Sequence, residues 1–172
     1  DLIPIRGKEC STQQTPFLQK KIKTYKDFAN STLPEIYGEN ILGKALHLEA
    51  HNFNSFILKN KGNGAFEIQK LPNQAQFSPT LGIEIQDLNN DGNLDIFGVG
   101  NIHEAEVETI RYDASKGYVL LGDKNGDFHF SDDFSYYSNL EAKTIKKITI
   151  GLETHFIILN KNDTLTILKS TN

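Results

Sequence analysis

The stretch FILKNKGNGAF, residues 56–66, decides the fold class that the sequence predicts. It consists of a short apolar run, a turn rich in Asn and Gly, and a second run that opens with a large apolar residue. Tight turns between strands need residues that tolerate a positive φ angle, and Gly64 stands where such a residue is required. The stretch therefore predicts a β-hairpin.

The same pattern recurs twice further along the chain. YVLLGDKNGDF covers residues 118–128, and a more divergent copy, FIILNKNDTL, covers residues 156–165. A hairpin that recurs with another pair of strands before it describes a four-stranded propeller blade. We therefore expect a mainly β fold of two to three antiparallel propeller-type blades, which is a partial β-propeller. Because a ring takes at least four blades, the expected partners are the remaining blades of a larger parent protein.

Ten strands are predicted from short apolar or alternating runs that are separated by Asn, Asp and Gly turns. These runs are residues 45–50, 55–59, 65–69, 82–86, 94–99, 117–121, 127–130, 145–150, 155–159 and 164–168. They place a single domain of β blades over residues 46–172. The chain begins at Asp1 and contains no methionine, which predicts a processed product or a piece of a longer chain.

Residues 1–45 have a different pattern and predict a helical lead segment. A Thr-Pro pair at residues 15–16 is typical of a helix start, and apolar residues follow at spacings of four, three and four. These apolar residues are Leu18, Ile22, Tyr25 and Ala29. The spacing predicts one helix over residues 16–29. A shorter helix is expected before Gly38, and a third over residues 39–45.

The loop DLNNDGNLD, residues 87–95, carries the sharpest functional signal. Oxygen-bearing side chains occupy its first, third, fifth and ninth positions. Gly92 lies at the sixth position, where the chain must turn sharply, and Asn93 can offer its backbone carbonyl from the seventh. A short loop of this kind wraps a hard cation such as Ca²⁺, which takes six to eight oxygen ligands. The predicted metal ligands are Asp87, Asn89, Asp91, Asn93 and Asp95.

The calcium loop is not an EF-hand, because its twelfth position is Gly98 instead of Glu and its flanks are strand-like. Three carboxylates close together repel each other unless a cation lies between them. A loop without a bidentate Glu binds Ca²⁺ weakly, with a Kd on the order of 10⁻⁴ to 10⁻³ M, which is useful only where calcium is plentiful. The expected location is therefore extracellular or at the cell surface, with the periplasm as an alternative. The competing interpretation of the loop is an empty Asx-rich turn.

The sequence resembles the FG-GAP or VCBS repeats of integrin-α-like β-propellers. Their calcium loop, which runs into an apolar strand and a Gly-rich turn, is matched by residues 87–95 and the following IFGVGN, residues 96–101. Further matches from Asn60 to Asp123 resemble the C-terminal part of large bacterial VCBS-repeat proteins related to cartilage acidic protein. The resemblance covers nearly all of the chain and implies a calcium-binding propeller segment. The first and third repeats lack the carboxylates, so one site is expected.

Three functions remain open from the sequence. The leading one is a ligand-binding or adhesion module, with a protein or glycan ligand and no catalytic residues. The second is a hydrolase or lyase that acts on glycans through carboxylates of the loop 102–116, two of which would then face one pocket about 5 to 9.5 Å apart. These carboxylates are Glu104, Glu106, Glu108 and Asp113. The third is a structural piece that only closes a propeller.

Aromatic side chains give a weaker signal for a ligand site. Phe53, Phe77, Tyr136 and Tyr137 offer flat surfaces on which a sugar ring can stack, although packing in the core or in turns is their commoner use.

Composition excludes several other classes of protein. The formal net charge is −4, so the chain has no basic excess with which to bind nucleic acid. Cys10 is the only cysteine, which excludes a disulfide framework within the chain. No apolar run approaches the roughly 20 residues of a membrane helix, so membrane insertion is not expected.

Overall fold

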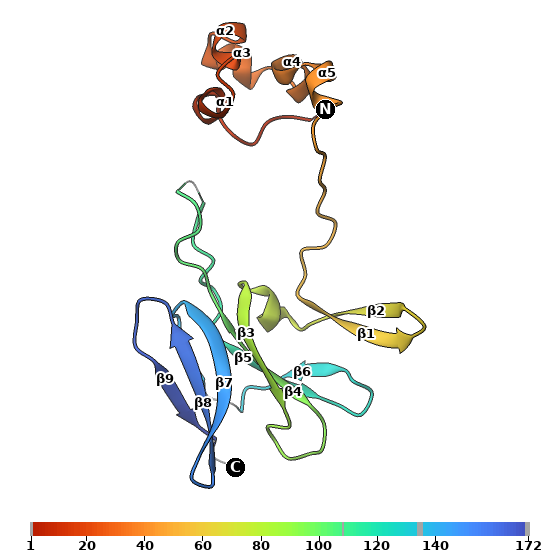
Figure 1. The fold of residues 1–172 in the computed structure, drawn as a ribbon, viewed down its shortest axis with the longest axis vertical. Coiled ribbons are helices and arrows are strands. Elements are labelled where there is room, and N and C mark those ends of the chain that lie inside the picture. Colours follow the sequence, from red (N-terminus) through yellow and green to blue (C-terminus); the bar gives the residue numbers. More distant parts are fainter. Residues whose placement is uncertain (1, 108, 134–135, 171–172) are drawn as a thin grey trace. The chain divides into compact units, whose positions relative to one another are not determined.

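The computed structural model describes residues 2–107, 109–133 and 136–170. The chain divides between His51 and Asn52 into two compact units, which we call the helical unit and the β unit (Figure 1). The division falls a few residues after the boundary at residues 45 and 46 that the sequence predicts. None of the helices in the described parts of the chain has the length and apolarity that crossing a membrane requires.

The helical unit consists of short helices around a small apolar core. They are α1 (Lys8–Gln14), α2 (Leu18–Lys21), α3 (Tyr25–Ala29), α4 (Leu33–Tyr37) and α5 (Glu39–Leu42). The buried residues Leu18, Ile22, Phe28 and Ile36 form the core. Because no helix exceeds two turns, packing around this core stabilises them more than their own hydrogen bonds do.

The predicted single helix over residues 16–29 is wrong, because the chain breaks between α2 and α3. Ile22 has an extended backbone, and Thr24 begins a new helix by accepting a hydrogen bond from the Asp27 N–H at 3.0 Å. The break turns Phe28 into the core and leaves Tyr25, which the spacing places on the apolar face, largely exposed.

The helix predicted before Gly38 is confirmed as α4. Thr32 and Glu35 form a reciprocal capping box at its start, in which the Glu35 carboxylate accepts the Thr32 N–H at 2.7 Å. This bond and the one from the Thr32 hydroxyl lower the pKa of Glu35. Gly38 ends the helix with a φ angle of +91°. The third predicted helix is found as the shorter α5.

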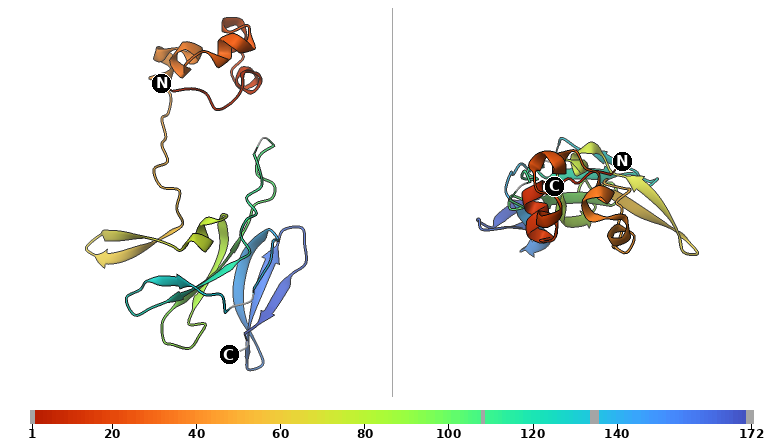
Figure 2. Two further views of the ribbon diagram at one scale, coloured as in Figure 1. Left: turned by 180° about the vertical axis from the view of Figure 1, so that it is seen from behind. Right: turned by 90° about the horizontal axis from the view of Figure 1, so that it is seen from above.

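The β unit contains three antiparallel sheets, visible from two sides in Figures 1 and 2. A hairpin is formed by β1 (Phe56–Gly62) and β2 (Ala65–Lys70). The middle sheet has the order β3 (Thr80–Gln86), β4 (Asp95–Gly100), β5 (Tyr118–Gly122) and β6 (Phe128–Phe130). The third sheet has the order β7 (Ala142–Ile150), β8 (Glu153–Asn160) and β9 (Thr166–Lys169). The mainly β class is therefore confirmed, and each of these strands overlaps a predicted one.

The one predicted strand that remains, residues 45–50, is wrong. Its apolar and polar residues alternate as they do in a strand, but the segment belongs to no sheet. Leu46 and Leu48 are exposed. Alternation alone does not make a strand, because a strand also needs a neighbour with which its backbone can pair.

The repeated hairpin turns have the predicted backbone geometry. Gly64 and Gly126 occupy equivalent positions in two of the turns, with φ angles of +77° and +74°. A β-branched residue at either position would be strained.

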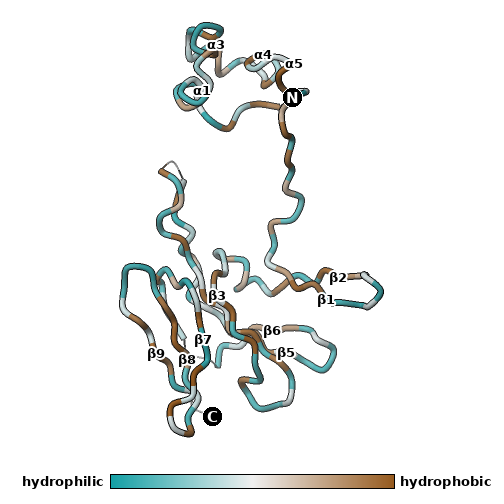
Figure 3. Tube along the Cα trace, viewed as in Figure 1, coloured by the Kyte–Doolittle hydropathy of each residue, from teal (hydrophilic) through white to brown (hydrophobic). Residues whose placement is uncertain are grey.

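The middle sheet is apolar on both faces. Successive residues of a strand point to opposite faces, and in β4 and β5 both sets of residues are largely apolar. Phe97, Val99 and Val119 pack against Ile145 and Phe156 of the third sheet. The opposite face carries Ile96, Tyr118 and Leu120, which lie in one cluster with Leu71 and Ala75, and Ile57 of the hairpin packs against it. Figure 3 shows apolar residues in these strands and hydrophilic residues in the turns that join them.

Candidate functional site

The candidate site is the loop 87–95, which joins β3 to β4. Asn90 and Gly92 both have left-handed backbone conformations, with φ angles of +61° and +87°. Asn and Gly are the residues that adopt this conformation at least cost. The tight path of the loop therefore follows from the residue types that the sequence places at these two positions.

Two predicted ligands converge on one point of the loop. The Asp91 N–H donates to Asp87 Oδ1 and to Asn89 Oδ1, both at 3.1 Å. The second oxygen of Asp87 accepts the Gly92 N–H at 2.8 Å. The side-chain oxygens of Asp87 and Asn89 therefore lie next to each other on the inner side of the turn.

Asp91 lies on the same loop and is held by its two Asn neighbours. Its Oδ1 accepts the Asn93 backbone N–H at 2.7 Å and the Asn93 side-chain amide at 2.9 Å. Its Oδ2 accepts the Asn89 side-chain amide at 3.0 Å. These hydrogen bonds, the backbone bond from Asn93 first, lower the pKa of the Asp91 carboxyl, with a further contribution from the charge of Lys124. Asp91 is therefore ionised at neutral pH.

Asp95 has a different environment from the other predicted ligands. Its side chain is fully buried, and its two oxygens accept the N–H groups of Leu88 at 2.7 Å and Gly122 at 2.9 Å. Leu88 lies at the start of the loop, whereas Gly122 ends β5. The Asp95 carboxylate thus connects the loop to the neighbouring strand of the middle sheet.

The donor chemistry of the loop fits Ca²⁺, because all the predicted ligands are oxygens of the kind that a hard cation prefers. Among the described residues, however, no three acidic, His or Cys side chains are grouped so that they could hold a metal ion. Of these ligands, Asp87 and Asn89 lie next to each other, Asn89 offers an amide oxygen instead of a carboxylate, and Asp95 is turned toward backbone N–H groups. Binding of a cation would therefore replace hydrogen bonds within the loop by bonds to the ion.

The loop 102–116 carries the carboxylates that the sequence offers for a glycan-acting enzyme. Its two sides pair between Ile102 and Tyr112. Glu104 forms an ion pair with Lys161 at 2.6 Å, and Glu106 takes part in a turn with Thr109. Glu108 lies outside the described residues. None of the other three predicted carboxylates lines the cavity beside Tyr118 or the one beside Asp87.

The charge of Lys161 also lies near a buried carboxylate. Glu141 is almost fully buried and pairs with Lys143 at 2.5 Å, while Lys161 lies 3.9 Å away. The hydrogen bond from Lys143, ahead of the charges of the two lysines, lowers the pKa of Glu141. These ion pairs link the loop 102–116 to the third sheet, and we assign them a structural role.

The cavity beside Tyr118 is a feature that the sequence analysis did not identify as a site. Only Tyr136 and Tyr137 among its lining residues were singled out from the sequence, as aromatic side chains.

Comparisons of the chain with models of protein families, with curated proteins and with solved structures find no match.

Proposed function

We propose that the chain is a calcium-binding segment of a β-propeller of the FG-GAP or VCBS type, which serves ligand binding or adhesion in a secreted or cell-surface protein. The observation that carries the proposal is the loop 87–95, where oxygen donors at the predicted spacing surround a left-handed turn. The side chains of Asp87, Asn89, Asp91 and Asp95 and the Asn93 carbonyl would hold the ion. A catalytic role is not part of this proposal.

The strand order of the middle sheet supports the propeller type. Four antiparallel strands in the sequential order β3-β4-β5-β6 are the arrangement of one blade. A sheet lies on each of its faces, as neighbouring blades do. The third sheet would then be a blade of three strands, and the hairpin would be the outer half of a preceding blade.

The outer face of the hairpin supports the presence of further blades. Leu58 lies opposite Ile68 across the two strands, and Phe66 lies opposite Asn60 two residues along, so their side chains share one face. The apolar residues on this face, 39–59% exposed, are Phe56, Leu58, Phe66 and Ile68. The opposite face of the hairpin carries Ile57, which packs against the middle sheet.

The edge strand β3 of the middle sheet also has an exposed apolar face. Leu81, Ile83 and Ile85 of β3 are 39–57% exposed. Ile85 pairs with Ile96, so this face lies on the side of the middle sheet that the hairpin packs against. The hairpin has two strands where the middle sheet has four. We assign the uncovered face to two further antiparallel strands that extend the hairpin sheet in the parent protein.

Calcium is expected to raise the melting temperature of the chain. An ion that binds only the folded state stabilises it by RT ln(1 + [L]/Kd), which is about 2.7 kcal/mol at 100-fold excess over Kd. The measurement is thermal unfolding followed by circular dichroism in about 10 to 100 mM calcium, which is 100 times the expected Kd of about 10⁻⁴ to 10⁻³ M. EDTA gives the calcium-free curve, and magnesium is the comparison ion.

The Asp91→Ala variant is the control for the calcium prediction. Asp91 is exposed and its hydrogen bonds lie within the loop, so the variant should fold and lose the calcium-dependent shift. Identical melting curves of the unmodified chain in calcium and in EDTA would contradict the calcium site.

The exposed apolar faces predict that the isolated chain associates with itself. Contiguous apolar surface of this kind marks a contact surface. Light scattering after gel filtration should therefore show a mass that rises with protein concentration. The Leu58→Lys/Ile68→Lys double variant should remain folded and shift the mass toward that of the monomer. A chain that stays monomeric at high concentration would count against the propeller-segment proposal.

A further inference from the structure

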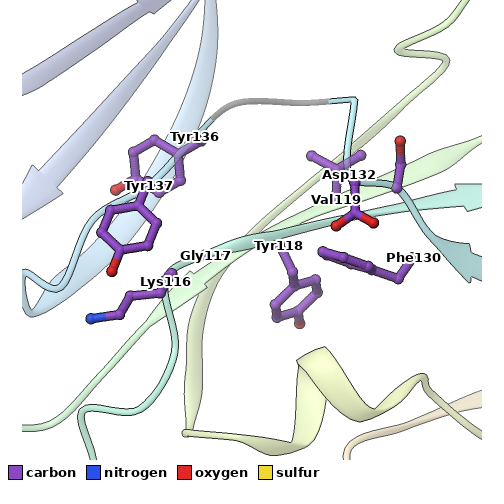
Figure 4. A pocket seen from close by; sticks show the side chains of 9 residues that line it. Lys116, Gly117, Tyr118, Val119, Phe130, Asp132, Tyr136 and Tyr137 are labelled. Atoms are coloured by element: carbon purple, nitrogen blue, oxygen red, sulfur yellow. The ribbon is translucent and has the colours of Figure 1, made fainter.

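The β unit contains a cavity of about 330 Å³ that the proposed function does not use. Its volume is at the lower end of the range of about 300 to 1,000 Å³ that is usual for small-molecule sites. Figure 4 shows it beside β5, between the end of β6 and the segment that leads to β7. Its lining residues come from 116–119, 130–132 and 136–137.

One side of the cavity is formed by an aromatic ring that packs against the backbone. A side chain on Gly117 would place its Cβ 2.5 Å from the Tyr136 ring, so only glycine leaves room for that ring. On the side of the core, Tyr136 makes an edge contact with Phe97 at 5.4 Å between ring centroids. Tyr136 is therefore fixed by contacts on two sides.

The other side of the cavity is also aromatic. Tyr118 is buried, and its hydroxyl lies 2.9 Å from that of Thr80. Burial raises the pKa of Tyr118, which the bond with Thr80 partly offsets, so the phenol is neutral at physiological pH. Phe130 ends β6 beside it, and the next N–H, of Ser131, donates to the Val119 carbonyl at 3.1 Å. Phe130 pairs with Leu120, so Tyr118 and Phe130 lie on the face of the middle sheet opposite to the one that Tyr136 contacts. The aromatic residues that line the cavity beside β5 therefore come from both faces of the sheet, with Tyr136 on one face and Tyr118 and Phe130 on the other.

Two opposite charges lie on different sides of the opening. The Lys116 ammonium lies 5.1 Å from the centroid of the Tyr137 ring, which is 75% exposed. Asp132 lies on the far side, after β6 (Figure 4). Its carboxylate makes no hydrogen bond or ion pair with the described residues. The cavity therefore offers one free acceptor group and one donor group.

We infer that this cavity binds one neutral pyranose unit at the end of a glycan. A pyranose ring has an apolar C–H face, which suits the exposed Tyr137 ring of the lining, and a hydroxyl edge that donates to a carboxylate and accepts from an ammonium group. The two charges balance, which disfavours a phosphate or another strongly anionic ligand. The inference deepens the proposed ligand-binding role and rests on it for the choice of ligand class.

The test uses the full chain and saturation-transfer-difference NMR with the methyl glycosides of glucose, galactose, mannose and N-acetylglucosamine at millimolar concentration. At least one of them should receive saturation at its ring protons. The Tyr137→Ala and Asp132→Ala variants should each weaken the binding at least tenfold. The matched control is Tyr25→Ala, because Lys8 lies over the exposed Tyr25 ring at 5.3 Å in the helical unit, outside the cavity. This control should bind as the unmodified chain does.

Absence of saturation transfer to all four glycosides would overturn the inference. Equal binding by the unmodified chain and both cavity variants would overturn it too, because the sugar would then bind elsewhere. The experiment is carried out in calcium and in EDTA, and the calcium-dependent shift in melting temperature is measured on the same samples. A chain that shows this shift without binding sugar retains the proposed calcium site, whereas sugar binding without a calcium shift retains only the cavity.

Discussion

The Asp95→Ala variant is expected to lose about 3 kcal/mol or more of unfolding free energy, even when calcium is chelated. The buried Asp95 carboxylate accepts hydrogen bonds from Leu88 and Gly122. A hydrogen bond to a charged group contributes about 1.5–3 kcal/mol, and alanine leaves two buried N–H groups without this partner. Urea unfolding followed by circular dichroism in EDTA measures the difference.

The control separates this structural role of Asp95 from calcium binding. Asp91 is exposed, so Asp91→Ala in EDTA is expected to cost no more than about 1 kcal/mol. In calcium, both variants should lack the stabilisation by the ion. If the two variants lose the same free energy in EDTA, the buried contact of Asp95 with β5 does not contribute as the geometry indicates.

The strands were predictable because the information for a hairpin is local. Gly64 and Gly126 lie between apolar runs, and the positive φ angle that each turn requires depends only on the residues in that turn. The failure at residues 45–50 has the opposite cause. Alternation predicts which side of a strand would be buried, but it does not supply the neighbouring strand.

The helical unit shows a second limit of pattern analysis. The spacing of Leu18, Ile22, Tyr25 and Ala29 suits a single straight helix, but a small core needs residues from several directions. The break before Thr24 buries Phe28 and leaves Tyr25 exposed to solvent. Both alternatives contain apolar residues at plausible spacings, so the choice between them depends on tertiary packing.

The turn at residues 87–95 between two strands was predictable from its residue types, whereas the contacts of its residues with the rest of the sheet were not. The contact of Asp95 with Gly122 joins residues 27 positions apart and requires β4 and β5 to be paired. The cavity beside Tyr118 likewise depends on β5, β6 and the segment after β6 lying together. Neither feature has a signal within a short window of sequence.

The middle and third sheets pack closely together at Gly82. Gly82 lies on β3, where an added Cβ would be 2.8 Å from both the Ile145 nitrogen and the Thr144 Cα of β7. Extra atoms in a packed core usually cost about 1–3 kcal/mol. Because the obstacles at Gly82 are backbone atoms that cannot rotate away, Gly82→Val should cost about 3 kcal/mol, measured by urea unfolding.

Ile85→Val is the matched control for Gly82→Val. Ile85 lies on the same strand but on the exposed apolar face, so the loss of one methylene group there should change the unfolding free energy by no more than about 0.5 kcal/mol. A large loss at Gly82 beside a small one at Ile85 is the result expected if β3 meets β7 through its backbone and leaves its other face for further strands. Equal effects of the two substitutions would mean that the middle and third sheets do not approach each other at Gly82, and the proposal that they are neighbouring blades would lose this support.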